Sequence, residues 1–293
     1  MRRRAFLTSL ALVPLAGCSN GSPGSSTDTA SPTATSTPPA TTSTAGETPT
    51  ETFPFELVRI DARDTVQLNV PFGFAISVRN TGSQARTFRS KLSMKVGDGT
   101  WQSVDGEIRF DVPAGEVRTW QTPARRAGYL QTYRYRLEAF DATWTTEIVP
   151  KRLDFGLSYT TPTGLSLNVL GVAFEKRYSG SDGTATAGGD ASAPTAPDGH
   201  VWAVFPVTAR NRAESPQSTP APDEFVLSID GETYRPTSAD VSGNPYRRVT
   251  LDPETSRRGE LVYAVPEGTS ANDVEVTWGA SLQRGDVKVT WDK

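Results

Sequence analysis

Two residue types that carry much of enzyme chemistry occur once each in this chain, as Cys18 and His200. Zinc and copper sites are built mainly from cysteine and histidine side chains, so a metal site of ordinary ligand type is excluded. A serine–histidine–aspartate triad would have to use His200, and a lone histidine at the start of a predicted strand is more typical of a surface residue. We therefore predict no metal, no cofactor and no catalytic residue of these kinds.

Carboxylates are the remaining candidates for chemistry. Asp182, Asp190 and Asp198 could offer oxygen ligands to calcium, but they stand eight residues apart rather than at alternating positions, which favours a solvated loop. A pair of carboxylates could hydrolyse glycosides if the fold brought them within about 5–10 Å of each other. A cell-surface hydrolase therefore stays open as an alternative. The six tryptophans could stack on sugars, although strand positions favour a role in the core.

The chain begins with a segment organised like an export signal. Positive charges at Arg2–Arg4 precede an apolar run over residues 6–16, which is shorter than the roughly 20 residues that cross a bilayer as a helix. Paired arginines shortly before a Phe-Leu pair resemble the twin-arginine signal, and the matching residues are Arg3, Arg4, Phe6 and Leu7. The resemblance implies export of a folded chain, which suits a protein with a single cysteine and no internal disulfide.

The residues before the cysteine resemble a lipobox, and they are Leu15, Ala16 and Gly17. This resemblance implies that residues 1–17 form a signal peptide and that Cys18 is lipidated as the first mature residue. Two acyl chains would anchor the protein stably, because each buried methylene contributes about 0.8 kcal/mol. We therefore expect membrane lipid as a partner of Cys18 and a location on the extracytoplasmic face of the cell membrane.

Residues 18–52 are predicted to be a lipidated N-terminus followed by a disordered stalk. After Cys18 this segment is rich in Ser, Thr and Pro and has no large apolar residue with which to build a core. Asn20 begins an Asn-Gly-Ser sequon and is a candidate N-glycosylation site. A flexible coil of this length spans about 30–35 Å, so it would hold the rest of the chain away from the membrane.

Alternation of apolar and polar residues dominates the chain after the stalk. Every second residue is apolar over most of 72–78, 88–96 and 133–139, as in half-buried antiparallel strands. Turn residues separate these runs at a spacing typical of β-sandwiches. We predict an all-β fold of two immunoglobulin-like antiparallel β-sandwiches in tandem, over residues 53–151 and 152–293.

Two motifs carry a family resemblance for the first of these units. Residues 78–82 read V-R-N-T-G, and residues 112–116 read V-P-A-G-E. They resemble the CARDB-type immunoglobulin-like domain, an adhesion-associated module of bacteria and archaea. In that family a strand ends in V-x-N-x-G and a tight turn precedes a later strand. The resemblance implies a sandwich that serves binding or adhesion.

The second unit repeats this organisation. Residues 201–212 parallel the strand that ends in Asn80, residues 229–234 supply an Asp-Gly hairpin, and residues 258–266 read R-G-E-L-V-Y-A-V-P. These three motifs resemble an unannotated immunoglobulin-like domain of secreted prokaryotic lipoproteins. The resemblance implies architecture and location but no activity. A segment rich in Gly, Ala, Ser and Thr near residues 178–199 is predicted to be a flexible insertion.

The net charge of the chain bears on the class of its partner. The formal net charge of −3 argues against nucleic acid as a partner. An acidic chain with little lysine beside its arginine is typical of haloarchaeal proteins. We expect a non-catalytic lipoprotein whose sandwiches bind a protein or a cell-surface glycan. The alternatives are the carboxylate-dependent hydrolase and an accessory subunit of an envelope transporter or secretion complex, which would expose an apolar patch.

Overall fold

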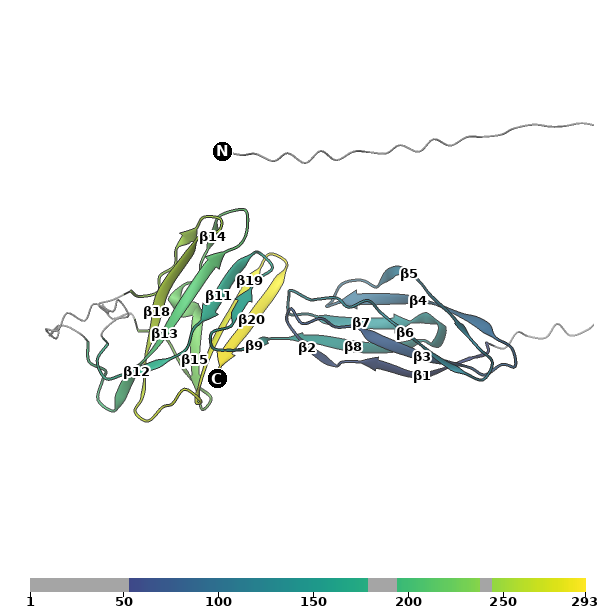
Figure 1. Ribbon diagram of the computed structural model, residues 1–293, viewed down its shortest axis with the longest axis horizontal. Helices are drawn as coiled ribbons and strands as arrows, with labels where there is room; N and C mark the ends of the chain where they lie inside the picture. The colour runs from purple at the N-terminus through teal and green to yellow at the C-terminus, as the bar shows by residue number, and fades with distance from the viewer. Residues whose placement is uncertain (1–52, 179–193, 238–243) are drawn as a thin grey trace, which may run out of the picture. The chain divides into compact units, whose positions relative to one another are not determined.

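The computed structural model describes residues 53–178, 194–237 and 244–293 (Figure 1). The predicted signal peptide and the predicted lipidated stalk therefore lie outside the described residues. Thr52–Lys293 forms one compact unit. Its described residues form β-strands and two short 3₁₀ helices, which are η1 (Glu138–Phe140) and η2 (Pro222–Glu224). No helix in the described part of the chain is long and apolar enough to span a membrane.

The first sandwich pairs a three-stranded sheet with a five-stranded sheet. The small sheet has the order β1-β3-β6, with β1 (Phe55–Ala62), β3 (Phe74–Asn80) and β6 (Val117–Gln121). The large sheet has the order β2-β8-β7-β4-β5, with β2 (Thr65–Gln67), β8 (Ala142–Val149), β7 (Thr132–Leu137), β4 (Arg86–Val96) and β5 (Gln102–Val112). The β2–β8 pair is parallel and the other pairs are antiparallel.

The alternation of the sequence decides which side of each strand enters the core. The apolar residues predicted to share one face of the strand around β3 are all buried, and they are Phe72, Phe74, Ile76 and Val78. Tyr135 on β7 faces them from the opposite sheet, with its ring centroid 4.9 Å from that of Phe74. Side chains of the two mainly antiparallel sheets thus interdigitate into one core. The predicted all-β fold with immunoglobulin-like sandwiches is confirmed.

The second sandwich also consists of two sheets, and each of them has five strands. One sheet has the order β10-β11-β13-β12, with β18 also paired to β13, and contains β10 (Ser158–Thr160), β11 (Leu165–Val169), β12 (Ala173–Glu175), β13 (His200–Asn211) and β18 (Ser256–Pro266). The other has the order β16-β15-β19-β20-β9, with β16 (Glu232–Tyr234), β15 (Phe225–Ile229), β19 (Val274–Leu282), β20 (Gly285–Asp292) and β9 (Lys151–Asp154). A short pair joins β14 (Gln217–Ser218) to β17 (Thr250–Leu251).

A buried asparagine explains the V-x-N-x-G motif of the first sandwich. Asn80 ends β3 and is fully buried. Its Nδ2 donates to the main-chain carbonyls of Gln84 at 2.7 Å and Val112 at 2.9 Å. Its Oδ1 accepts the N–H of Gly82 at 2.9 Å. The side chain therefore fixes the turn after β3 and ties it to the end of β5.

The main chain of Asn80 connects this motif to the Ala-Gly-Glu turn. The N–H of Asn80 donates to the carbonyl of Glu116 at 3.0 Å, and the N–H of Gly115 donates to the carbonyl of Asn80 at 2.9 Å. Gly115 has a φ of 72°, a left-handed conformation that favours glycine. The two motifs are distant in sequence but form one hydrogen-bonded structure.

The second sandwich contains the same arrangement at Asn211, which ends β13 and is also fully buried. Its Nδ2 donates to the carbonyls of Ser215 at 2.8 Å and Leu251 at 3.0 Å. Its Oδ1 accepts the N–H of Ala213 at 2.8 Å. In the neighbouring turn the left-handed position is taken by Glu254, with a φ of 60°. We call this three-bond arrangement the asparagine corner, and both sandwiches have one.

The residues at the two ends of the insertion predicted near 178–199 are packed in the structure. Tyr178 is fully buried, and the indole Nε1 of Trp202 donates to the carbonyl of Pro194 at 3.0 Å. Both ends of the segment therefore belong to the packed sandwich. Its centre, residues 179–193, lies outside the described residues.

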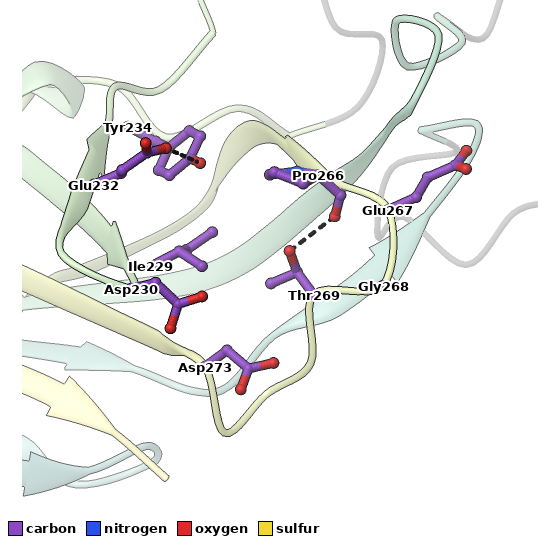
Figure 2. A pocket seen from close by; sticks show the side chains of 9 residues that line it. All are labelled: Ile229, Asp230, Glu232, Tyr234, Pro266, Glu267, Gly268, Thr269 and Asp273. Carbon is purple, nitrogen blue, oxygen red and sulfur yellow. Dashed lines mark hydrogen bonds between the residues drawn. The ribbon is translucent and has the colours of Figure 1, made fainter.

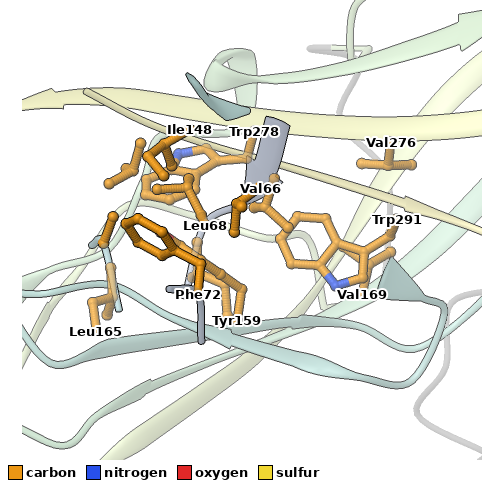
Figure 3. Close-up of a cluster of buried hydrophobic side chains, with 14 of the residues drawn as sticks. Val66, Leu68, Phe72, Ile148, Tyr159, Leu165, Val169, Val276, Trp278 and Trp291 are labelled. Carbon is orange, nitrogen blue, oxygen red and sulfur yellow. The ribbon is translucent and has the colours of Figure 1, made fainter. Parts of the chain in front are cut away.

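The strand ladders stay within each sandwich, with one isolated bridge between Leu130 and Asp286, but the buried core is continuous between the two sandwiches. One cluster holds side chains from both, and Figure 3 shows among them Val66, Leu68, Phe72 and Ile148 of the first sandwich with Tyr159, Leu165, Trp278 and Trp291 of the second. The N–H of Leu130 also donates to the carbonyl of Asp286 at 2.8 Å. Because they share an apolar core, we expect the two sandwiches to unfold together.

Candidate functional site

The residues predicted to direct export and anchoring lie outside the described residues. They are Arg3, Arg4, Phe6 and Leu7 of the twin-arginine signal, Leu15, Ala16 and Gly17 of the lipobox, Cys18 and Asn20. Asp182 and Asp190 also lie outside them. The roles of these residues stay predictions.

His200 is the first residue of β13, at the strand start that the sequence predicts. Its Nδ1 lies 3.0 Å from the carbonyl oxygen of Asp198, and the ring is half-buried. In the described part of the chain, no group of three or more His, Cys, Asp or Glu side chains could hold a metal ion. His200 therefore has the environment of a strand-end residue.

The tryptophans divide between core and surface. Trp202, Trp278 and Trp291 are buried, and Trp120 and Trp144 are half-buried. Trp101, which directly precedes β5, has 44% of its surface exposed. One exposed ring does not make a stacking platform, so the tryptophans mainly build the sandwiches, as their strand positions indicate.

An open cavity of about 430 Å³ lies at one end of the second sandwich (Figure 2). The hairpin between β15 and β16 forms one wall, and the connection from β18 to β19 forms the other. We call it the acidic pocket, and its lining residues are Ile229, Asp230, Glu232, Tyr234, Pro266, Glu267, Gly268, Thr269 and Asp273. Four of these nine side chains are carboxylates, so the pocket disfavours anions.

Hydrogen bonds and an ion pair favour the ionised form of two carboxyls of the acidic pocket. The Lys176 ammonium donates to the Glu267 carboxylate, and this bond lowers the pKa of Glu267. The N–H and Oγ of Ser270 donate to the Asp273 carboxylate at 2.8 and 2.6 Å, and these bonds lower the pKa of that carboxyl. Both pKa shifts are downward, whereas a general acid for glycoside hydrolysis needs a raised pKa. The acidic pocket thus lacks the feature that the hydrolase alternative requires of these two groups.

A buried carboxylate occurs elsewhere in the second sandwich. Glu260 on β18 is 4% exposed and accepts a hydrogen bond from the hydroxyl of Tyr178 at 2.5 Å. Its main-chain N–H donates to the carbonyl of Asn244 at 2.9 Å, and its carbonyl accepts the N–H of Tyr246 at 2.8 Å. Glu260 therefore fastens two chain segments to β18, which is a structural role.

The acidic pocket was not predicted from the sequence. The Asp-Gly hairpin at residues 230–231 was predicted as a turn, and this hairpin supplies one wall. The other wall, residues 266–273, has a Pro, a Gly and a Ser-x-x-Asp pattern that signal a turn. Only the tertiary fold shows that the two turns adjoin each other.

A scan against protein-family models finds no match, and a search of the curated proteins finds no match either. Solved structures similar to the chain include the yjhA protein from Bacillus subtilis, with 18% identity over 47% of this chain and 99% of that chain and a TM-score of 0.35.

Two further solved structures match a similar share of this chain. An uncharacterized β-sandwich protein from Clostridium difficile 630 has 13% identity over 49% of this chain and 94% of its own, with a TM-score of 0.33. The secreted protein MPT63 from Mycobacterium tuberculosis has 15% identity over 50% of this chain and 98% of its own, with a TM-score of 0.34. The CARDB resemblance rests on its motif residues alone, because no family model matches.

Proposed function

We propose that the chain is a membrane-anchored cell-surface lipoprotein that displays two non-catalytic β-sandwiches, residues 53–151 and 152–293, for binding or adhesion. The observation that carries the proposal is the order of segments along the chain. A twin-arginine-like leader precedes the Leu-Ala-Gly-Cys sequence at 15–18, and a Ser/Thr/Pro-rich segment then leads into the sandwiches. Lipid on Cys18 anchors the protein to the extracytoplasmic face of the membrane.

Binding suits the sandwiches better than catalysis does. The two pocket carboxyls with shifted pKa values, Glu267 and Asp273, are shifted toward the ionised form. The buried Glu260 supports the fold through Tyr178. The partner is a protein or a cell-surface glycan, and the motif residues favour a CARDB-like module in a protein of haloarchaeal type.

Replacing Cys18 with serine is expected to move most of the protein from the membrane fraction to the medium. Serine has nearly the shape of cysteine, but it lacks the thiol to which lipid is attached, so the anchor is lost. Cell fractionation followed by immunoblotting measures the shift. A Ser19→Ala variant changes the next residue and should stay with the membrane. If Cys18→Ser fractionates like the wild type, the lipid anchor is wrong.

A further inference from the structure

The outward side of the five-stranded sheet of the first sandwich carries a set of basic side chains. We call it the basic face, and it consists of Arg89, Lys91 and Lys95 on β4, Arg109 on β5, and Arg134 and Arg136 on β7. Successive side chains of a strand point to opposite sides of a sheet. On these strands the alternate residues, such as Phe88, Ile108 and Tyr135, are buried in the core. The basic residues therefore share the side that is turned away from the core.

The strand register places like charges directly opposite each other on this face. Lys95 lies opposite Arg134 in the β4–β7 pair, and Arg89 lies opposite Arg109 in the β4–β5 pair. Like charges at directly opposed cross-strand positions destabilise a sheet. Two such pairs disfavour the folded sandwich, so a contribution to stability does not account for their presence.

Carboxylates balance only part of the positive charge. Arg89 forms an ion pair with Glu107 at 3.8 Å, and Glu107 also lies opposite Lys91 in the strand register. Arg136 pairs with Asp141 at 2.7 Å. Within the residues that the structure describes, no ion pair is formed by Lys95, Arg109 or Arg134. Three further carboxylates lie on or beside this side of the sheet, and they are Asp111 on β5, Glu138 of η1 and Glu147 on β8. The positive charge without an ion pair is therefore centred on Lys95, Arg109 and Arg134.

We propose that the basic face binds an acidic polysaccharide, a chain of sugars bearing carboxylate or sulfate groups. This inference rests on the proposed function, because it names the surface and the partner class for binding by the displayed sandwiches. Neighbouring strands lie about 4.8 Å apart, and alternate residues along a strand lie about 6.7 Å apart. The cationic groups therefore lie close enough together for several of them to contact one linear polyanion.

Hydroxyl groups lie among the cationic groups and favour a sugar ligand. Thr145 and Thr143 on β8 lie opposite Arg134 and Arg136. Ser93 on β4 lies opposite Arg136 from the other side, and its hydroxyl donates to the Glu138 carboxylate at 3.2 Å. Guanidinium groups bind carboxylate and sulfate through charge-assisted hydrogen bonds, and hydroxyls both donate to and accept from sugar hydroxyls. The face thus offers partners for both kinds of group on an acidic sugar.

Two other polyanions fit this surface less well. None of the large apolar side chains that are exposed in the described part of the chain belongs to β4, β5, β7 or β8. Proteins that lie on a membrane surface combine basic residues with apolar side chains that enter the lipid. Proteins that hold single-stranded nucleic acid stack its bases on aromatic side chains. Trp101 borders these strands, since it directly precedes β5 and is exposed. On the four strands themselves, charge and hydroxyls without large exposed apolar side chains favour a polysaccharide.

The test uses the full chain with Cys18→Ser, so that lipid on the protein does not bind vesicles directly. The probes are alginate, which carries carboxylates, and dextran sulfate, with neutral dextran as a control. We expect binding to both acidic polymers and not to dextran. Binding should weaken as the salt concentration rises, because salt screens exposed charges.

A double variant, Lys95→Gln with Arg134→Gln, identifies the surface. We expect it to bind the acidic polymers about tenfold more weakly at low salt, since two charged contacts are lost. Its Tm should rise by about 1–3 °C, because one like-charge pair is removed. The matched control, Arg284→Gln with Lys288→Gln, removes the same charge from exposed positions of the second sandwich and should bind like the parent.

Three results would overturn the inference. The first is a double variant that binds as tightly as its parent, and the second is the absence of binding to either acidic polymer. The third is binding that depends on Lys95 and Arg134 but is directed to phosphatidylglycerol vesicles or duplex DNA instead of the polysaccharides. A wild-type protein that ignores polysaccharides but remains lipid-anchored contradicts this inference alone and leaves the proposed anchoring and display intact.

Discussion

Replacing either buried asparagine, Asn80 or Asn211, with alanine is expected to lower the free energy of unfolding by about 3 kcal/mol or more. Each side chain makes three hydrogen bonds to the main chain. Alanine would leave two carbonyls and one N–H without these partners, and each buried unsatisfied group costs about 1–3 kcal/mol. Urea unfolding followed by tryptophan fluorescence measures the change.

Two further substitutions separate hydrogen bonding from volume. Asn211→Asp keeps the size of the side chain but replaces the donor Nδ2 with an oxygen that faces the carbonyls of Ser215 and Leu251. It should therefore destabilise the fold at least as much as alanine does. Asn272→Ala, at an exposed position, should change stability by less than about 0.5 kcal/mol. Wild-type stability in Asn80→Ala and Asn211→Ala would contradict a structural role for the asparagine corner.

Replacing Trp291 with alanine is expected to cost about 3–5 kcal/mol, the usual range for removing a large buried aromatic side chain. Trp291 on β20 is fully buried. Its Nε1 donates to the carbonyl of Leu157 at 2.8 Å, so the substitution removes both packing and a hydrogen bond. Scanning calorimetry measures the loss, and Trp101→Ala, which truncates an exposed ring, should change stability by less than about 0.5 kcal/mol.

The same variant tests whether the two sandwiches are coupled. Trp291 belongs to the buried cluster that continues into the first sandwich at Val66 and Leu68 (Figure 3). If the shared core couples the sandwiches, the wild type unfolds in a single transition and Trp291→Ala moves that transition as a whole. An unfolding curve in which the first sandwich keeps its midpoint while the second unfolds early would show that they are independent.

The fold was predictable because most of its information is local. Alternation around Phe74 and Ile76 identifies the buried side of β3 without any knowledge of its partners. The V-x-N-x-G sequence predicts a strand followed by a turn, and Asn80 and Gly82 do form that turn. The parallel between Asn80 and Asn211, visible in the sequence, reflects a shared hydrogen-bonding arrangement that holds the same turn in both sandwiches.

The candidate surfaces were not predictable because they depend on register and on packing between distant segments. Lys95 and Arg134 read as ordinary solvent-side residues of separate strands, and nothing local indicates that they lie opposite each other. The acidic pocket likewise joins Asp230 to Asp273 across two turns. The sequence shows the charges on each strand. The total charge of one face of a sheet depends on which strands are neighbours and on their register.

The insertion shows a different limit. The low-complexity composition after Tyr178 predicts a loop. Composition alone does not distinguish the residues at the ends of that loop from those at its centre. Tyr178 is nevertheless buried and bonded to Glu260. An aromatic residue at the edge of a polar, glycine-rich segment indicates where packing begins, and it is the signal that places the boundary.

Mass spectrometry of the mature N-terminus tests lipid anchoring most directly. The protein is isolated from the membranes of the cells that produce it, digested, and analysed for its N-terminal peptide. We predict that this peptide begins at Cys18 and carries the added mass of covalently attached lipid. A mature chain that begins at another residue, or a Cys18 with a free thiol in the membrane-bound protein, would contradict the proposal that this is a surface lipoprotein.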